Sequence, residues 1–255
     1  MKRTKLQKIA FCTLTAGVLA ASQSVVAHTT LQIPSVVEGA NIYNNAQIGH
    51  GCGSETGSAP VIANSIVFPD GTDSTVAVNG AVVDGATTDQ YLNWGGQITN
   101  VPSNDIFEKN AVNCGVSGVE CKNPVGNYSW KGRLAPHGTT GLVPLRIKAA
   151  FINEFSCAKS VKLKVAIADI CKITKVTGFS TPGVVNFWTP FVEGSLFNRP
   201  DSKSEAANFT ITRASALPEA DENGVACGAG VDVVIIPSAA QLNHDMPIPG
   251  VWPKR

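Results

Sequence analysis

Apolar and polar residues alternate along much of this chain. Residues 161–167, 143–149 and 209–212 each place an apolar side chain at every second position. This period of two is typical of a strand with one face in a core and the other toward solvent, as in antiparallel sheets. No segment of useful length has a strong helical period, so we predict strands throughout.

Turn-forming residues separate the predicted strands. The clearest turn signals are Pro69-Asp70-Gly71, Asn79-Gly80, Asp84-Gly85 and Asn223-Gly224. Short strands at regular spacing favour an all-β fold, an immunoglobulin-like antiparallel β-sandwich with long inserted loops. Segments 102–126 and 172–230 are polar and look inserted, although strands in 172–230 could equally extend the sandwich.

The first 27 residues have the pattern of a secretory signal peptide. Four basic residues precede an apolar stretch at 9–21, and Val25-Val26-Ala27 supplies small residues at the cleavage positions. The apolar stretch is too short to span a membrane, and no later segment has 18 uninterrupted apolar residues. We expect export to the periplasm, cleavage before His28, and one mature domain at 28–255.

Net charge and cysteine content indicate which partners and which compartment suit the chain. The signal holds four of the 20 basic residues and none of the 19 acidic ones, so the net charge after cleavage is −3. No basic patch is apparent, which argues against nucleic acid as a partner. Six cysteines remain after cleavage, and an even number in an exported chain favours disulfides over free thiols. These are Cys52, Cys114, Cys121, Cys157, Cys171 and Cys227.

His28 is the strongest candidate for a metal ligand. After cleavage its α-amine and its ring Nδ1 can chelate one ion together, and a second imidazole would complete a three-nitrogen site. Cu(II) prefers nitrogen donors in a square arrangement. The reference pKa of an α-amine is about 7.7–8.0, so its deprotonation for copper costs little. The alternative is that cleavage merely happens to fall before a histidine.

His50 is the favoured second ligand. It lies in the segment Ile48-Gly49-His50-Gly51-Cys52-Gly53, where the glycines leave room near the imidazole and Cys52 can pin the turn. His137 and His244 lie in segments expected to be ordinary loops. Glu38 and Glu55 are near the candidate site in sequence and could supply an axial oxygen. The usual interpretation of such residues is that they are solvated surface carboxylates.

The sequence lacks the motifs of several enzyme classes. There is no Gly-x-Ser-x-Gly nucleophile elbow, no glycine-rich phosphate loop and no His-Glu-x-x-His zinc helix. We therefore expect a binding protein rather than an enzyme.

Several short segments together resemble the YcnI-like periplasmic copper-binding family, in its proteobacterial branch with a Gly-His-Gly-Cys-Gly block. The segments are His28-Thr29-Thr30-Leu31, Glu38-Gly39, Ile48-Gly49-His50-Gly51-Cys52-Gly53, Asn93-Trp94-Gly95-Gly96, Trp130-Lys131-Gly132-Arg133-Leu134-Ala135-Pro136, Phe155-Ser156-Cys157 and Pro247-Ile248-Pro249-Gly250. The resemblance covers about residues 28–171 in patches, plus this last segment, and the histidine–cysteine block is its most specific part.

The resemblance implies a single sandwich that binds Cu(II) through the mature N-terminal histidine, with a carboxylate and a tryptophan nearby. His28 matches that histidine, and His50 falls near the place of the carboxylate. The family's tryptophan position holds Lys162 and Leu163 here. Trp94, Trp130 or Trp188 could substitute, but a core role is expected for each.

The resemblance also implies a disulfide between Cys52 and Cys157. Proximity in the sequence favours Cys114 with Cys121, which leaves Cys171 with Cys227. Six cysteines allow 15 pairings, so the last two pairs rest on weaker grounds.

The leading hypothesis is a periplasmic Cu(II)-binding protein, a chaperone or scavenger in copper uptake or resistance, with copper and another copper-handling protein as partners. One alternative is a copper-dependent oxidative enzyme resembling lytic polysaccharide monooxygenases, which also use an N-terminal histidine. Those enzymes usually present a flat aromatic surface, and this chain has only three tyrosines. Another alternative is an adhesive or structural module in which His28 is incidental.

Overall fold

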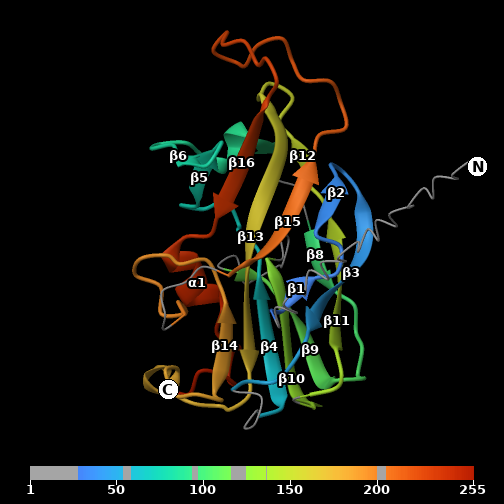
Figure 1. The fold of residues 1–255 in the computed structure, drawn as a ribbon, viewed down its shortest axis with the longest axis vertical. Helices are drawn as coiled ribbons and strands as arrows, with labels where there is room; N and C mark the ends of the chain where they lie inside the picture. Colours follow the sequence, from blue (N-terminus) through green and yellow to red (C-terminus); the bar gives the residue numbers. More distant parts are fainter. Residues whose placement is uncertain (1–27, 54–58, 94–96, 116–124, 136, 200–204) are drawn as a thin grey trace, which may run out of the picture.

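The fold is an elongated all-β sandwich (Figure 1). This computed structural model describes residues 28–53, 59–93, 97–115, 125–135, 137–199 and 205–255. The predicted signal peptide, residues 1–27, lies outside the described residues. In the described part, no helix is long and apolar enough to cross a membrane.

The sandwich has a small sheet and a large sheet. In the small sheet the order is β1 (Thr30–Leu31), β3 (Asn41–Ile48), β11 (Gly141–Lys148) and β8 (Gln97–Asn100). In the large sheet it is β6 (Ala81–Val82), β5 (Thr75–Val78), β16 (Val231–Ile236), β13 (Ala158–Ile170), β4 (Val61–Val67), β10 (Gly126–Leu134) and β9 (Phe107–Asn113). β14 (Val185–Trp188) and β15 (Ala207–Thr212) also pair with β13, and β2 (Ser35–Val37) pairs with β15. A separate ribbon joins β7 (Leu92–Asn93) to β12 (Phe151–Ile152).

β13 is the long central strand with which β4, β14, β15 and β16 pair (Figure 1). Its first half pairs with β15 and β16, and its second half pairs with β4 and β14. The predicted sandwich is therefore confirmed, but the large sheet is mixed, because β16 runs parallel to β13 and β2 runs parallel to β15. The segments that look inserted in the sequence contribute strands to this sheet, β9 in the first and β14 and β15 in the second.

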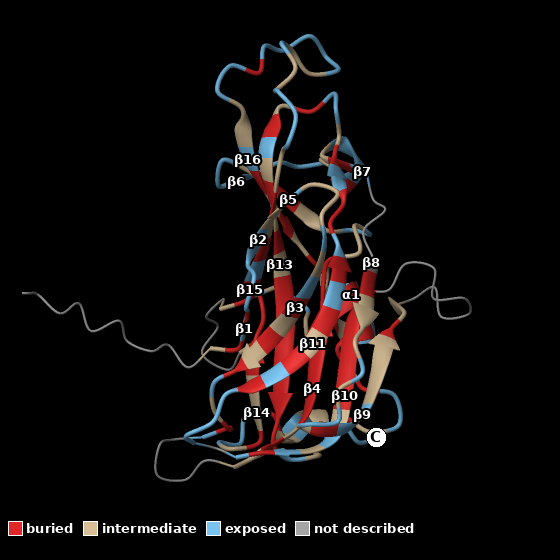
Figure 2. Ribbon diagram, turned by 90° about the vertical axis from the view of Figure 1, so that its right-hand side faces the viewer, coloured by how far each residue is buried: buried red, intermediate tan, exposed pale blue. Residues whose placement is uncertain are grey.

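The predicted alternation places the core correctly. Val161, Leu163, Val165 and Ile167 of β13 all belong to the core between the two sheets, together with the apolar positions of β11 and β15. The opposite face of the large sheet packs against a second apolar cluster, which includes Phe179 and residues of α1 (Ala239–Asp245). Figure 2 shows buried residues running along the strands of the body.

The Asn79-Gly80 turn behaves as its sequence predicts. Both residues have positive φ, 49° for Asn79 and 87° for Gly80, and they connect β5 to β6 in an antiparallel hairpin. Positive φ at both central positions matches the twist of the flanking strands and suits an Asn-Gly pair.

Two disulfides occur among the described residues, and their pairing corrects the prediction. Cys52 is bonded to Cys171 and Cys157 to Cys227, instead of Cys52 to Cys157 and Cys171 to Cys227. Cys157 precedes β13 and Cys171 follows it, so the two lie at opposite ends of a 13-residue strand, roughly 40 Å apart at the usual rise. The predicted Cys114–Cys121 bridge involves a position outside the described residues.

Candidate functional site around His28

Strand pairing brings the two predicted histidines together. β1 pairs antiparallel with β3, with Thr30 opposite Gln47 and Leu31 opposite Ala46. When this register is continued toward the N-terminus, His28 comes level with Gly49, the residue before His50. An edge strand only two residues long is thus enough to place His28 beside the turn that contains His50.

Trp188 is the common neighbour of both histidines. The His28 ring stands edge-on to the indole, with ring centroids 4.7 Å apart and an interplanar angle of 88°. The His50 ring also stands edge-on, with centroids 6.4 Å apart. Trp188 ends β14 and is only 7% exposed. It is therefore a core residue, as the sequence predicts, and it also forms a wall of the candidate site.

Glu205 orients the His28 ring. Its Oε2 atom lies 2.7 Å from His28 Nε2, and the same carboxylate forms an ion pair with Arg199. The Arg199 guanidinium in turn lies over the Trp188 ring, 5.7 Å from the centroid. Because an ionised carboxylate can only accept hydrogen bonds, the His28 contact places a proton on Nε2 and leaves the lone pair on Nδ1.

The electrostatic surroundings favour neutral His28. Burial lowers the pKa of its imidazole, and the Arg199 cation and His50 lower it further. Glu205 alone would favour the charged ring, but its charge is shared with Arg199. A neutral imidazole is the form that can bind a metal ion.

The His50 turn is held by the backbone and by a disulfide. His50 Nδ1 contacts the carbonyl oxygen of Gly51, and Asn186 Nδ2 donates to the same carbonyl at 3.3 Å. The Cys52–Cys171 bridge then ties the turn to the end of β13. The expectation that Cys52 pins this turn is correct, although its partner is not the expected one.

A buried carboxylate lies beneath the site. Asp169 Oδ2 accepts hydrogen bonds from Thr29 Oγ1 at 2.5 Å and from Trp188 Nε1 at 2.6 Å, while Asn64 Nδ2 donates to Oδ1 at 2.8 Å. Asp169 is 1% exposed. Burial raises the pKa of this carboxyl group, and the three hydrogen bonds oppose that effect.

The other residues singled out in the sequence have different roles. Glu38 accepts hydrogen bonds from the backbone N–H groups of Ile152 and Ala214. His244 lies in the helix α1 and not in a loop as expected, with Nδ1 at 2.6 Å from Asp245 Oδ1. His137 is exposed. Glu55 and Trp94 lie outside the described residues.

The sequence interpretation missed Glu205, Arg199 and Asp169. Glu205 is 177 residues from His28, so no local pattern could connect them. Asp169 did leave a signal, because it continues the inward-facing series of β13 at a position where an apolar residue is expected. A charged residue at an inward position of a strand is uncommon and usually has a specific partner.

A hollow opens beside His28, with a volume of about 520 Å³. His28, Leu31, Lys164 and Glu205 are among the residues that line it. Among the described residues, no group of three or more His, Cys, Asp or Glu side chains is placed to hold a metal ion.

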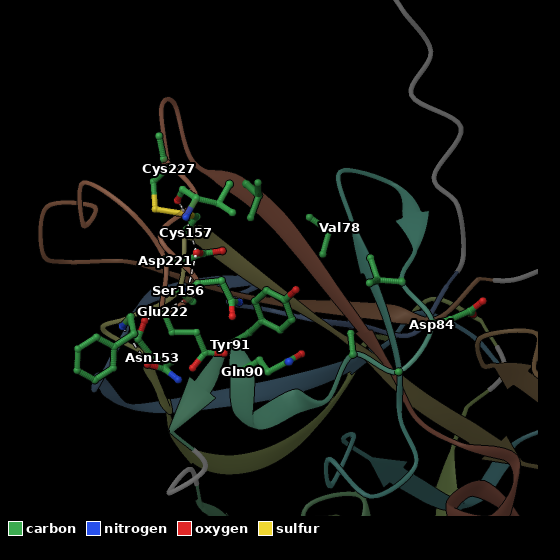
Figure 3. A pocket seen from close by; sticks show the side chains of 18 residues that line it. Val78, Asp84, Gln90, Tyr91, Asn153, Ser156, Cys157, Asp221, Glu222 and Cys227 are labelled. Carbon is green, nitrogen blue, oxygen red and sulfur yellow. Dashed lines mark hydrogen bonds between the residues drawn. A yellow bond between two sulfur atoms is a disulfide. The ribbon is translucent and has the colours of Figure 1, made fainter.

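A second cleft lies near the opposite end of β13 (Figure 3). Its volume is about 400 Å³, and its lining includes Tyr91, Asn153, Asp221 and the Cys157–Cys227 disulfide. Arg213 braces one wall by donating to the carbonyl oxygens of Asn153, Ser156 and Ala158. This cleft shares no residue with the His28 site.

No protein-family model matches the chain, and the comparison with curated proteins found no match. The resemblance to the copper-binding family therefore remains a prediction.

Proposed function

We propose that the processed protein binds Cu(II) at His28 and handles copper in the periplasm, as a chaperone or scavenger that does not turn over a substrate. The observation that carries the proposal is the hydrogen bond between His28 Nε2 and Glu205. Metal-ligating histidines usually donate their second ring N–H to a carboxylate, which fixes the tautomer and the orientation of the ring.

The ligand set follows from that contact. With Nε2 occupied by Glu205, the free donor of the ring is Nδ1, on the side of the residue's own backbone nitrogen. In the processed chain that nitrogen is an amine, so the two nitrogens can chelate one ion. Bound copper would supply a Lewis-acidic centre, and this chain's residues would hold and orient its nitrogen ligands.

His50 is the proposed source of the third nitrogen. Its Nδ1 faces the Gly51 carbonyl, which leaves Nε2 as the donor for a metal. Both rings lie against Trp188, so one rigid side chain sets the position of both imidazoles. Preorganisation of this kind reduces the ordering cost of binding.

The supporting context agrees with export. Two disulfides fit an oxidising compartment, and the periplasm is the compartment that the N-terminal pattern predicts. The oxidative-enzyme alternative shares the N-terminal histidine with this proposal. It requires oxidised products when copper, a reductant and peroxide are supplied, and we expect none.

The decisive experiment is a copper titration of protein that begins at His28, followed by electron paramagnetic resonance. We expect one Cu(II) per chain with a spectrum typical of nitrogen ligands. A variant with one glycine added before His28 keeps every side chain but loses the chelating amine, so tight binding should be lost without a change in thermal stability.

Two histidine variants test the third ligand. His50→Ala should weaken binding and alter the spectrum, whereas the exposed His137→Ala serves as the matched control and should change neither. An unchanged spectrum in His50→Ala would exclude the two-histidine site. Equal binding with and without the added glycine would exclude chelation by the His28 amine and ring.

A further inference from the structure

Asp169 is a carboxylate buried in the core of the sandwich. Isolated buried carboxylates are costly, and replacing buried polar groups by well-packed apolar residues is often neutral or stabilising. Asp169 nevertheless occupies an inward position on β13, where it receives three hydrogen bonds. The identity of the donors indicates what the carboxylate does.

The two oxygens of Asp169 serve different parts of the molecule. Oδ1 faces β4, where Asn64 donates to it. Oδ2 accepts from Thr29 and from Trp188, which are the residue after His28 and the ring against which His28 packs. One atom therefore connects the second residue of the mature chain to the aromatic wall of the candidate site.

Besides the contacts of the His28 ring with Glu205 and Trp188, the N-terminal segment is held by a short strand. β1 contributes only two residues to the small sheet, and chain termini tend to fray unless they are tied down. Thr29 is 1% exposed, so its hydroxyl group is drawn into the protein just before the strand begins.

We propose that Asp169 is a positioning residue that docks the processed N-terminus, holding Thr29 and Trp188 so that the His28 amine and ring stay at one place. This inference rests on the proposed copper function for its purpose. The docking itself exists without metal and can be measured without it.

The test compares Thr29→Val with Thr29→Ser in metal-free protein that begins at His28. Valine keeps the shape of threonine but cannot donate to Asp169, and serine restores the donor. The readout is amide hydrogen exchange of the N-terminal peptide. Losing this buried hydrogen bond should speed exchange about tenfold in Thr29→Val, and Thr29→Ser should remain close to the wild-type protein.

Thr88→Val is the matched control. Thr88 is also buried, at 2% exposure, and donates one side-chain hydrogen bond, at 3.3 Å to the Gly71 carbonyl oxygen. It should leave exchange of the N-terminal peptide unchanged. Equal acceleration in Thr29→Val and Thr88→Val would overturn the proposal, as would no acceleration in Thr29→Val.

Substitutions of Asp169 provide a second arm. Asn64 now donates its Nδ2 to Asp169, and among the described residues its Oδ1 has no hydrogen-bond partner. A 180° turn of the Asn64 amide group would therefore let Oδ1 accept from an amide at position 169. Asp169→Asn should therefore retain docking, whereas Asp169→Ala should lose it. Faster exchange in Asp169→Asn equal to that in Asp169→Ala would show that acceptor geometry is not what docks the N-terminus.

Copper spectra separate the docking from the proposed function. If wild-type protein binds Cu(II), Thr29→Val should broaden or shift its paramagnetic resonance and Thr29→Ser should restore it. An unchanged spectrum in Thr29→Val would overturn the link to the metal. If wild-type protein fails to bind copper while Thr29→Val still accelerates exchange, the proposed function fails and the docking role stands.

Discussion

At the scale of single residues, Glu205 is the side chain that commits His28 to one orientation. Replacing it by alanine removes the acceptor for Nε2 and releases Arg199. We expect Cu(II) affinity in Glu205→Ala to fall by about 10- to 100-fold, the usual effect of losing a carboxylate behind a ligating histidine. A competition titration against a chelator measures this loss, and Glu108→Ala, an exposed carboxylate on β9, is the matched control.

A substitution of Trp188 tests the aromatic side chain that contacts both histidines. Trp188→Phe keeps an aromatic ring but removes the indole N–H that donates to Asp169. We expect the free energy of unfolding to fall by about 1–3 kcal/mol, measured by urea denaturation. Copper-induced quenching of tryptophan fluorescence should also diminish in this variant. Trp130→Phe, on β10, should keep the quenching; loss of quenching in that variant instead would place copper elsewhere.

At the scale of elements, the two disulfides lie at the two ends of β13 and have separable effects. Replacing Cys52 and Cys171 by alanine opens a loop of 119 residues and should cost about 2–5 kcal/mol of stability. It should also weaken copper binding, because the His50 turn loses its anchor. Replacing Cys157 and Cys227 should lower stability by a similar amount and leave copper affinity unchanged. Thermal melts and copper titrations of both double variants provide the comparison.

The strands could be predicted because alternation records which face of each strand is buried. Residues 161–167 show this directly, since every second side chain enters the core. Alternation does not record which strands are neighbours. The parallel pairing of β13 with β16 and the bonding of Cys52 to Cys171 depend on which end of β13 each segment reaches. α1, with seven residues, is too short for a helical period to stand out.

The candidate site could be predicted only in part, for a related reason. His28 and His50 stand out because of a predicted cleavage site and a glycine-rich turn, which are local features of the sequence. Glu205 and Trp188 reach the site through pairing with β13 and through the loops that follow it, so their partners are distant in sequence. Residues of this kind become visible only once the sheet is assembled.

At the scale of the whole molecule, β13 connects the two ends of the sandwich. Strands from both ends pair with it, so neither end can unfold without exposing part of β13. We expect one cooperative unfolding transition, with tryptophan fluorescence and far-ultraviolet circular dichroism changing together and the calorimetric enthalpy equal to the van't Hoff value. Two separated transitions would instead indicate two domains.

The Cys52–Cys171 bond also bears on which oxidation state of copper the proposed site would select. Thiolates are soft ligands that favour Cu(I). With its sulfur atoms joined to each other, the bridge beside His50 offers no thiolate. The donors that remain around His28 are nitrogens and a carboxylate, which favour the divalent ion. In the proposed site, this structural crosslink would therefore also favour the divalent ion, because it removes the thiolate ligands that would stabilise Cu(I).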